Sequence, residues 1–133
     1  MITIFTADCR LNNKNCLYPH RIEVTDEATL RQAVSMDYTC AEFRENRRSI
    51  GSFLRCDCLA FDVDNDHSDI PAEWVLPKHI AEFFSGVTFW VHYSRSNMKE
   101  KNGKEARPKF HVFFPRLAVL LSSTVSQRAS ELL

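Results

Sequence analysis

The sequence predicts an α+β fold, in which a mostly antiparallel sheet carries helices packed on one face and leaves the other face open and polar. Two observations lead to this class. Three apolar runs alternate with ionisable residues at the two-residue period of a strand. Two further segments have the apolar spacing and the terminal residues of helices. Because helices cover the apolar side of such a sheet, its ionisable side is expected to stay open as a platform.

The bulk composition narrows the class of protein. A chain of 133 residues with 44% apolar and 26% charged residues predicts one domain, residues 1–133, with a real core. Basic and acidic residues are equal at 17 each, so any surface for a polyanion must be local. No apolar run approaches the roughly 20 residues of a membrane span, so no membrane partner is expected. The five cysteines and the absence of a signal-peptide pattern at the start predict reduced thiols in a cytoplasmic protein.

The first part of the chain predicts a strand, a helix and a basic segment. Residues 2–6 are β-branched and aromatic, which is typical of a strand. Thr25 or Asp26 can cap a helix that runs to about Asp37. Residues 42–55 follow as a basic stretch, in which four arginines outnumber two glutamates.

The second part begins with the strand that carries the acidic pair. In a strand over residues 59–64, Asp62 and Asp64 project to the same side, with about 6.6 Å between alternate positions. A polar turn breaks this strand. A helix is expected over residues 71–84, and Pro77 should interrupt its first turns.

Two further strands complete the predicted sheet. Gly86 ends the helix, and residues 87–94 form a strand. A polar loop over residues 95–107 leads to a strand in which Lys109 and His111 point outward. The alternation predicts two sides: Phe89, Val91, Tyr93, Phe110, Val112 and Phe114 face the core, whereas Trp90, His92 and Ser94 share the polar side.

The pair Asp62 and Asp64 is the first candidate for chemistry. Two carboxylates at the end of an apolar strand can hold Mg²⁺ or Mn²⁺, which then bind phosphate oxygens. The alternative is an ordinary strand followed by a solvated acidic turn over residues 65–69. The sequence leaves both interpretations open.

The strand with His111 is the second candidate. Arg107, Lys109 and His111 are three phosphate-binding groups on or beside one strand. A lone histidine among aromatic residues is otherwise a packed or surface residue. The preceding loop adds to the charge, since residues 95–109 contain six basic and two acidic residues, but a solvated hairpin loop explains such a run equally well.

The spacing Cys56-x-Cys58 suggests a zinc site only weakly. Structural zinc requires four ligands, usually from two close pairs, and no second close pair is present in the sequence. Buried thiols are the favoured interpretation.

Taken together, these motifs resemble the archaeo-eukaryotic primase superfamily, in particular the primase and primase-polymerase domains of phages, plasmids and integrated elements. The matching pieces are the strand that ends Asp62-Val63-Asp64, the run 91–96 that contains Ser94 and Arg95, the basic loop, and the run 107–111. The resemblance covers roughly residues 40–115, and its specificity lies in the order and spacing of the motifs.

The resemblance implies an RRM-like primase core and a DNA primase or polymerase activity, that is, nucleotidyl transfer during replication of mobile-element DNA. Asp62 and Asp64 match the family's metal-binding carboxylates, with Mg²⁺ or Mn²⁺ as cofactor. His111 matches the nucleotide-binding histidine, and these three residues would be catalytic. Four neighbours are the implied further nucleotide contacts: Ser94, Arg95, Arg107 and Lys109. The implied partners are nucleoside triphosphates, a DNA template and a replicative helicase.

One departure from the family pattern bears on activity. The family places a third carboxylate on a strand downstream of the histidine, whereas after His111 this chain has only Glu131. Residues 116–133 are Leu- and Ser-rich and unlike the rest, so we expect a truncated or frame-shifted copy that is incomplete as an enzyme. A metal-dependent nuclease or phosphatase and a non-catalytic nucleic-acid-binding remnant are the alternatives.

Overall fold

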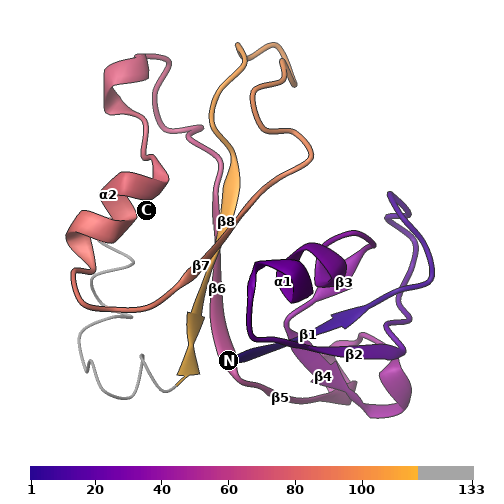
Figure 1. Ribbon diagram of the computed structural model, residues 1–133. Coiled ribbons are helices and arrows are strands. Elements are labelled where there is room, and N and C mark those ends of the chain that lie inside the picture. Colours follow the sequence, from indigo (N-terminus) through magenta and orange to yellow (C-terminus); the bar gives the residue numbers. More distant parts are fainter. Residues whose placement is uncertain (117–133) are drawn as a thin grey trace. The chain divides into compact units, whose positions relative to one another are not determined.

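The computed structural model describes residues 1–116 (Figure 1). The chain divides into two compact units, Met1–Leu59 and Ala60–Leu133, and each is described by itself. The described residues contain three small sheets and two α-helices, and each of the three sheets contains antiparallel strand pairs. The predicted α+β class is therefore confirmed, while the RRM-like primase core and the single domain over residues 1–133 stay predictions.

The first unit is built around β1 (Ile2–Thr6), which is buried along its whole length. It lies between β2 (His20–Val24) and β3 (Tyr38–Thr39) in the order β2-β1-β3. The pairing of β1 with β2 is a regular antiparallel ladder from Ile2↔Val24 to Thr6↔His20. A central strand needs apolar or β-branched residues on both faces, and the sequence of β1 supplies them, which is why the predicted strand over residues 2–6 is confirmed.

The helix α1 (Glu27–Ala33) begins where the sequence predicts and ends earlier. The carboxylate of Asp26 accepts a hydrogen bond from the Thr29 amide at 2.8 Å, which caps the first turn. The predicted end at Asp37 is wrong, because the Asp37 carboxylate accepts hydrogen bonds from the amides of Leu11 and Asn12, both at 2.9 Å. These bonds hold Asp37 in a loop connection to the chain before β2, which is incompatible with a further helical turn.

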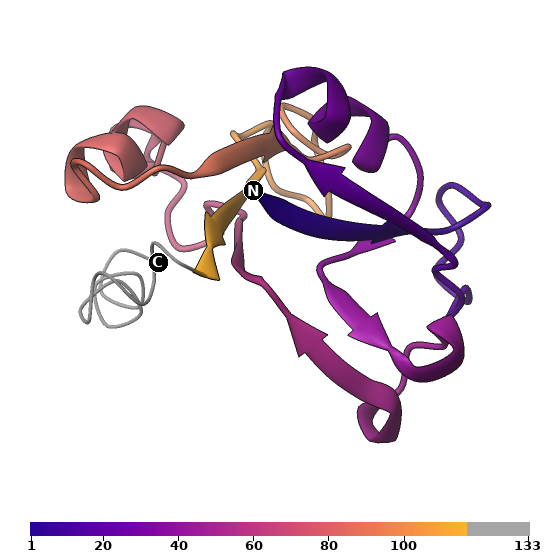
Figure 2. The ribbon, with the colours of Figure 1, turned by 60° about the horizontal axis from the view of Figure 1, so that its bottom comes forward.

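The basic stretch of the sequence forms a hairpin in the first unit (Figure 2). The strands β4 (Ala41–Phe43) and β5 (Phe53–Cys56) pair antiparallel as a separate two-stranded sheet. Two short 3₁₀ turns, Arg44–Asn46 and Ile50–Ser52, lie between them. After β5, the Asp57 carboxylate fastens this hairpin to β1, since it accepts bonds from the Thr3 amide at 2.9 Å and the Thr3 hydroxyl at 2.6 Å.

The second unit contains the sheet that the alternating runs predict. Its strands are β6 (Cys58–Val63), β7 (Trp90–Tyr93) and β8 (Phe110–Pro115), in the order β6-β8-β7. Strands β7 and β8 pair antiparallel, with Val91 opposite Val112 and His92 opposite His111, so the predicted sides of these strands are confirmed. Two residues depart from the predicted pattern: Phe113 is buried although it lies on the side of His111, and Tyr93, which was predicted to face the core, is 53% exposed.

The apolar side of this sheet is covered by α2 (Pro77–Phe83). The ring of Phe84, which ends the helix, meets the ring of Phe114 in β8 edge-on at 4.9 Å between centroids, and Ile80 is buried. Pro77 is the first residue of α2, where its missing N–H is not required, so the predicted interruption is confirmed. Before it, Pro71–Glu73 forms only a 3₁₀ turn.

The backbone at Gly86 has a φ of +80°, which fits its predicted role at the end of the helix. The atypical tail over residues 116–133 lies, apart from Arg116, outside the described residues. No helix within the described residues is long and apolar enough to cross a membrane.

Candidate functional site

The candidate site lies on the polar side of the β6-β8-β7 sheet. In β6 the side chains alternate as expected, since Val63 is buried whereas the side chains of Asp62 and Asp64 are 73% and 58% exposed. Both carboxylates therefore project from the same side of the strand into solvent.

Each of these carboxylates faces a basic group of the neighbouring strand. Nε2 of His111 lies 3.6 Å from Oδ1 of Asp62, and Nζ of Lys109 lies 3.7 Å from Oδ1 of Asp64. The residue numbers rise from Asp62 to Asp64 along one strand and fall from His111 to Lys109 along the other. Neighbouring strands that pair in this way run antiparallel. The structure thus brings together the four residues that the sequence singled out on separate runs.

The ammonium group of Lys109 is the centre of charge in this site. Its side chain is only 10% exposed, and Nζ also lies 3.4 Å from Oδ1 of Asp66. Burial by itself raises the pKa of Asp66, but the positive charges of Lys109 and Lys104 lower it more, so the net pKa lies below its ordinary value. The turn after β6 is therefore negatively charged and already paired with lysine.

The second histidine of the sheet is neutral at physiological pH. The rings of His92 and His111 are 5.8 Å apart between centroids and nearly perpendicular. Burial of the His92 ring, followed by the charges of His111 and Arg95, lowers the pKa of His92 to about 4. His92 can therefore accept or donate a hydrogen bond at this face without adding charge.

Ser94 and Arg95 follow directly after β7 and lie beside Lys109 in the backbone. The Ser94 amide donates to the Lys109 carbonyl at 2.9 Å, and the Lys109 amide donates to Oδ1 of Asn97 at 2.9 Å. The Ser94 hydroxyl is 3.1 Å from that of Ser96. These bonds fix the turn after β7 to the strand that carries Lys109, so the two predicted nucleotide contacts belong to the same local structure.

Arg107 occupies a different kind of position. Its side chain is 1% exposed, and its guanidinium donates to the carbonyls of Asn65 and Ser68 and to Oδ1 of Asp69, at 2.9, 3.0 and 2.7 Å. Its Nε donates to the Glu105 carbonyl, and its Cζ lies 5.6 Å from the centre of the Trp74 ring. Through these contacts Arg107 stabilises the acidic turn over residues 65–69. Its contact with nucleotide stays a prediction.

Asn65 also stabilises the acidic turn, and it was not singled out from the sequence. It is buried with a φ of +54°, in the left-handed region that asparagine tolerates better than most residues. Its side chain donates to the carbonyls of Val75 and Pro108 at 2.9 and 2.8 Å and accepts from the Val75 amide at 2.7 Å. The signal available in the sequence was an asparagine directly after the strand, at the point where the chain must reverse.

The basic loop is folded onto the acidic turn rather than standing apart from it. Nζ of Lys104 donates to the Asp66 carbonyl at 3.2 Å and lies 3.5 Å from its Oδ1. With Arg107 and Lys109, half of the six basic residues in this segment are bound to the acidic turn. A hollow of about 300 Å³ is lined by residues 100–105 at the tip of the loop, and none of the predicted site residues lines it.

The donor set fits a hard divalent ion in kind, but the described residues supply few ligands. Asp62 and Asp64 present carboxylate oxygens to solvent, which suits Mg²⁺ or Mn²⁺. Within residues 1–116, no group of three or more histidine, cysteine, aspartate or glutamate side chains is arranged to hold a metal ion. The pair Cys56 and Cys58 is split between two strands, with Cys56 exposed in β5 and Cys58 buried in β6.

Comparison with known proteins yields no match among protein-family models, curated proteins or solved structures. The site therefore has to be interpreted from its own residues.

Proposed function

We propose that the second unit binds a nucleoside triphosphate together with Mg²⁺ or Mn²⁺, as the nucleotidyltransferase site of a DNA primase or polymerase. One observation carries the proposal: two carboxylates at the end of β6 face two basic groups at the start of β8, as the pairs Asp62–His111 and Asp64–Lys109. Opposite-charge pairs of this kind also stabilise neighbouring strands by themselves. Here the carboxylates are 73% and 58% exposed, which leaves oxygens open to a cation, and the basic groups beside them suit a polyphosphate.

The chemistry of each half supports this ligand. Asp62 and Asp64 would hold the divalent ion, and water would complete its coordination. When bound, such an ion neutralises phosphate oxygens and activates an attacking hydroxyl. Lys109 would exchange its carboxylate partners for phosphate oxygens, and His111 would donate to the same group. Ser94, whose amide donates to the Lys109 carbonyl, and the adjacent Arg95 would add further contacts.

Binding and transfer make different demands on the chain. Two carboxylates suffice to hold one ion weakly, whereas phosphoryl transfer with two ions usually draws on more acidic ligands. We therefore propose nucleotide and metal binding as the function of the described residues, with incorporation into a primer on a DNA template dependent on a further carboxylate.

Isothermal titration calorimetry of the full chain with a nucleoside triphosphate, with and without Mn²⁺, tests the proposal. We expect binding that depends on Mn²⁺, abolished by Asp62→Asn and weakened by His111→Ala. The matched control is Glu82→Gln, which neutralises an exposed acid of α2 and should bind like the wild type. If Asp62→Asn also binds triphosphate and metal like the wild type, the assignment of Asp62 is wrong.

A parallel assay separates the neighbouring functions. Metal-dependent hydrolysis of a phosphomonoester or phosphodiester without triphosphate, lost in Asp62→Asn, would identify a nuclease or phosphatase instead. No triphosphate binding and no hydrolysis would leave a folded remnant without this site.

A further inference from the structure

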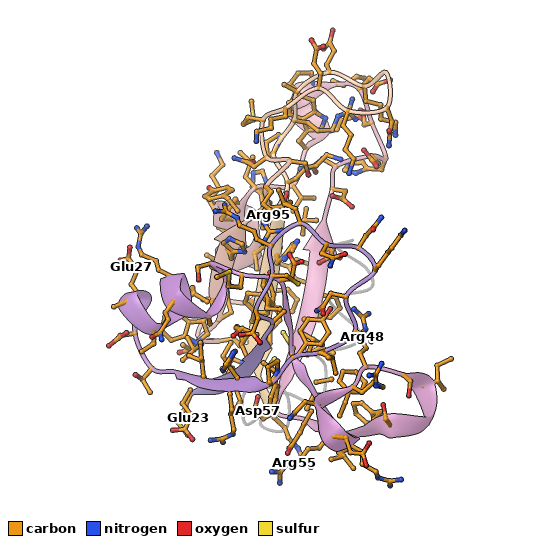
Figure 3. All side chains as sticks on the ribbon, turned by 90° about the vertical axis from the view of Figure 1, so that its right-hand side faces the viewer. Glu23, Glu27, Arg48, Arg55, Asp57 and Arg95 are labelled. Atoms are coloured by element: carbon orange, nitrogen blue, oxygen red, sulfur yellow. The ribbon has the colours of Figure 1, made fainter. Side chains whose placement is uncertain are left out.

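The hairpin of the first unit has an unusual surface. We call residues 41–56 the basic arm; it comprises β4, the two 3₁₀ turns and β5. All four residues of β5 are exposed, as is nearly the whole turn region between the strands. Figure 3 marks Arg48 and Arg55 on this arm. A two-stranded sheet of this kind buries little area of its own, so most of its side chains stay open to solvent.

The arm concentrates arginine. It holds four arginines and no lysine, against two glutamates: Arg44, Arg47, Arg48 and Arg55, with Glu42 and Glu45. Glu42 is paired with Arg55 at 2.6 Å. Arg44 and Arg48 are exposed, and among residues 1–116 the structure shows no ion pair for either of them. Two guanidinium groups are thus available to a phosphate backbone, for which their planar geometry is well suited.

The arm also exposes apolar and aromatic side chains beside these charges. Ile50, Phe53 and Leu54 are 102%, 52% and 48% exposed. The ring of Phe53 rests edge-on against Phe43, with 6.2 Å between centroids, so it is supported from one side. An exposed ring that is supported from one side, on an arm that also carries exposed arginines, can stack on an unpaired base.

The arm is held in place rather than free to collapse. The Arg48 amide donates to the Cys16 carbonyl at 2.7 Å, and the Tyr18 amide donates to the Asn46 carbonyl at 3.0 Å. Glu45 and Asn46 have φ values of +54° and +57°, a left-handed pair that costs energy and persists only where the surroundings enforce it. The arginines of this turn are therefore displayed from a fixed backbone, which lowers the entropy lost on binding.

We propose that the basic arm binds single-stranded nucleic acid, with Arg44 and Arg48 on the phosphate backbone and Phe53 stacked on a base. The choice of a template strand as the ligand rests on the proposed function. The residues of the basic arm are different from those of the proposed nucleotide site.

A second copy of the chain is the main competing occupant, because β5 is an exposed strand. Two features oppose edge pairing. Leu54 is an extra residue between the pairs Glu42↔Arg55 and Phe43↔Phe53, and such a bulge twists a strand and interrupts a regular edge. A symmetric contact would also bring two arms together that each carry four arginines against two glutamates, and this like charge opposes it.

Fluorescence anisotropy of a labelled oligothymidylate, titrated with the full chain at several salt concentrations, tests the charge contacts. We expect the double variant Arg44→Gln/Arg48→Gln to bind roughly tenfold more weakly and to flatten the slope of log K against log salt by about 1.4. The matched control is Arg21→Gln/Arg31→Gln, which removes two exposed, ion-paired arginines of the same unit and should leave affinity and slope unchanged.

The stacking contact is tested with Phe53. Phe53→Ala should weaken binding roughly tenfold, and Phe53→Trp should retain it, with fluorescence of the new indole quenched on binding. The control Phe83→Ala removes another exposed ring that rests edge-on against a neighbour, Phe84, and should bind normally.

Three results would overturn the inference: no binding by the wild type, unchanged binding by the arm variants, or a change of sedimentation in Phe53→Ala with oligothymidylate affinity unaffected. The last would identify the arm as a contact between copies. Triphosphate titration of the arm variants keeps this test separate from the proposed function. Loss of triphosphate dependence on Asp62 would overturn that function and leave the arm result standing.

Discussion

Two basic segments of this chain look alike in sequence and differ in structure. The basic loop, residues 95–109, and the basic arm, residues 41–56, each contain more arginine and lysine than acid. In the loop, Lys104, Arg107 and Lys109 are bound to carboxylates and carbonyls of the acidic turn after β6. In the arm, all four arginines are exposed, and among the described residues only Arg55 has an ion pair, while Arg47 donates to the sulfur of Cys16.

The role of a basic residue in this chain therefore depends on whether an acidic group lies near it in space. The loop returns to a turn about forty residues earlier in the chain, and its cations stabilise that turn. The arm returns to β1 through Asp57 and leaves its outer arginines in solvent. The same local charge is therefore structural in one unit and available for binding in the other.

The largest expected effect is at Arg107. Arg107→Ala should destabilise the second unit by about 3–5 kcal/mol, because it leaves the carbonyls of Asn65 and Ser68 without their buried donor and breaks the pair with Asp69. Urea unfolding followed by tryptophan fluorescence measures it. Both tryptophans of the chain, Trp74 and Trp90, lie in this unit.

Lys99→Ala is the control for this change, since it removes an exposed lysine of the same loop and should alter stability by less than about 0.5 kcal/mol. Equal stability of the two variants would break the comparison, because Arg107 would then be as dispensable as a surface charge.

Asn65 should have the next largest effect. Asn65→Ala loses three hydrogen bonds and forces alanine into the left-handed region, so we expect a loss of about 2 kcal/mol by the same fluorescence measurement. Asn65→Gly removes the same bonds without the backbone strain. A variant with glycine that is no more stable than the one with alanine would show that the φ of +54° carries no cost.

The length and the residue pattern of each strand decide whether it could be predicted from the sequence. The strands β1, β6, β7 and β8 are long enough to show a pattern, and all four were predicted. Strands β3 and β4 have two and three residues and show no usable periodicity. The signal for β2 was present, since Ile22 and Val24 alternate with polar residues, but it was short and mostly exposed.

The candidate site also has residues whose position could be predicted from the sequence and residues whose position could not. Residues on alternate positions of a strand are predicted to share a side, so the meeting of Asp62 and Asp64 with Lys109 and His111 required only that their strands be neighbours. The burial of Arg107 could not be predicted, because it depends on carbonyls and a carboxylate 38 to 42 residues away. Asn65 was missed for the same reason, since one of its partners is the Pro108 carbonyl.

A smaller effect should appear with pH at His92. Its pKa is lowered to about 4 in the folded protein, below the 6.5 of the unfolded chain, so the unfolded state binds the proton first as pH falls. The stabilisation is complete above pH 6.5 and is lost progressively between pH 6.5 and 4. Since the ring is only partly buried, we expect a loss of about 1 kcal/mol at pH 5.

Urea unfolding at pH 7 and pH 5, compared between wild type and His92→Gln, measures this contribution. The variant should lose about that much less stability on acidification. An identical pH dependence in both proteins would assign the acid sensitivity to other groups.

The smallest effect is expected at the arm. Arg48→Gln should change the stability of the first unit by less than about 0.5 kcal/mol, because the side chain is exposed while the bond from the Arg48 amide to the Cys16 carbonyl is kept. Far-UV circular dichroism is the measurement, since this unit contains no tryptophan. A loss above about 1 kcal/mol would place Arg48 with Arg107 as a structural cation. A neutral effect together with weakened oligothymidylate binding would establish that the arm, unlike the loop, keeps its charge for a ligand.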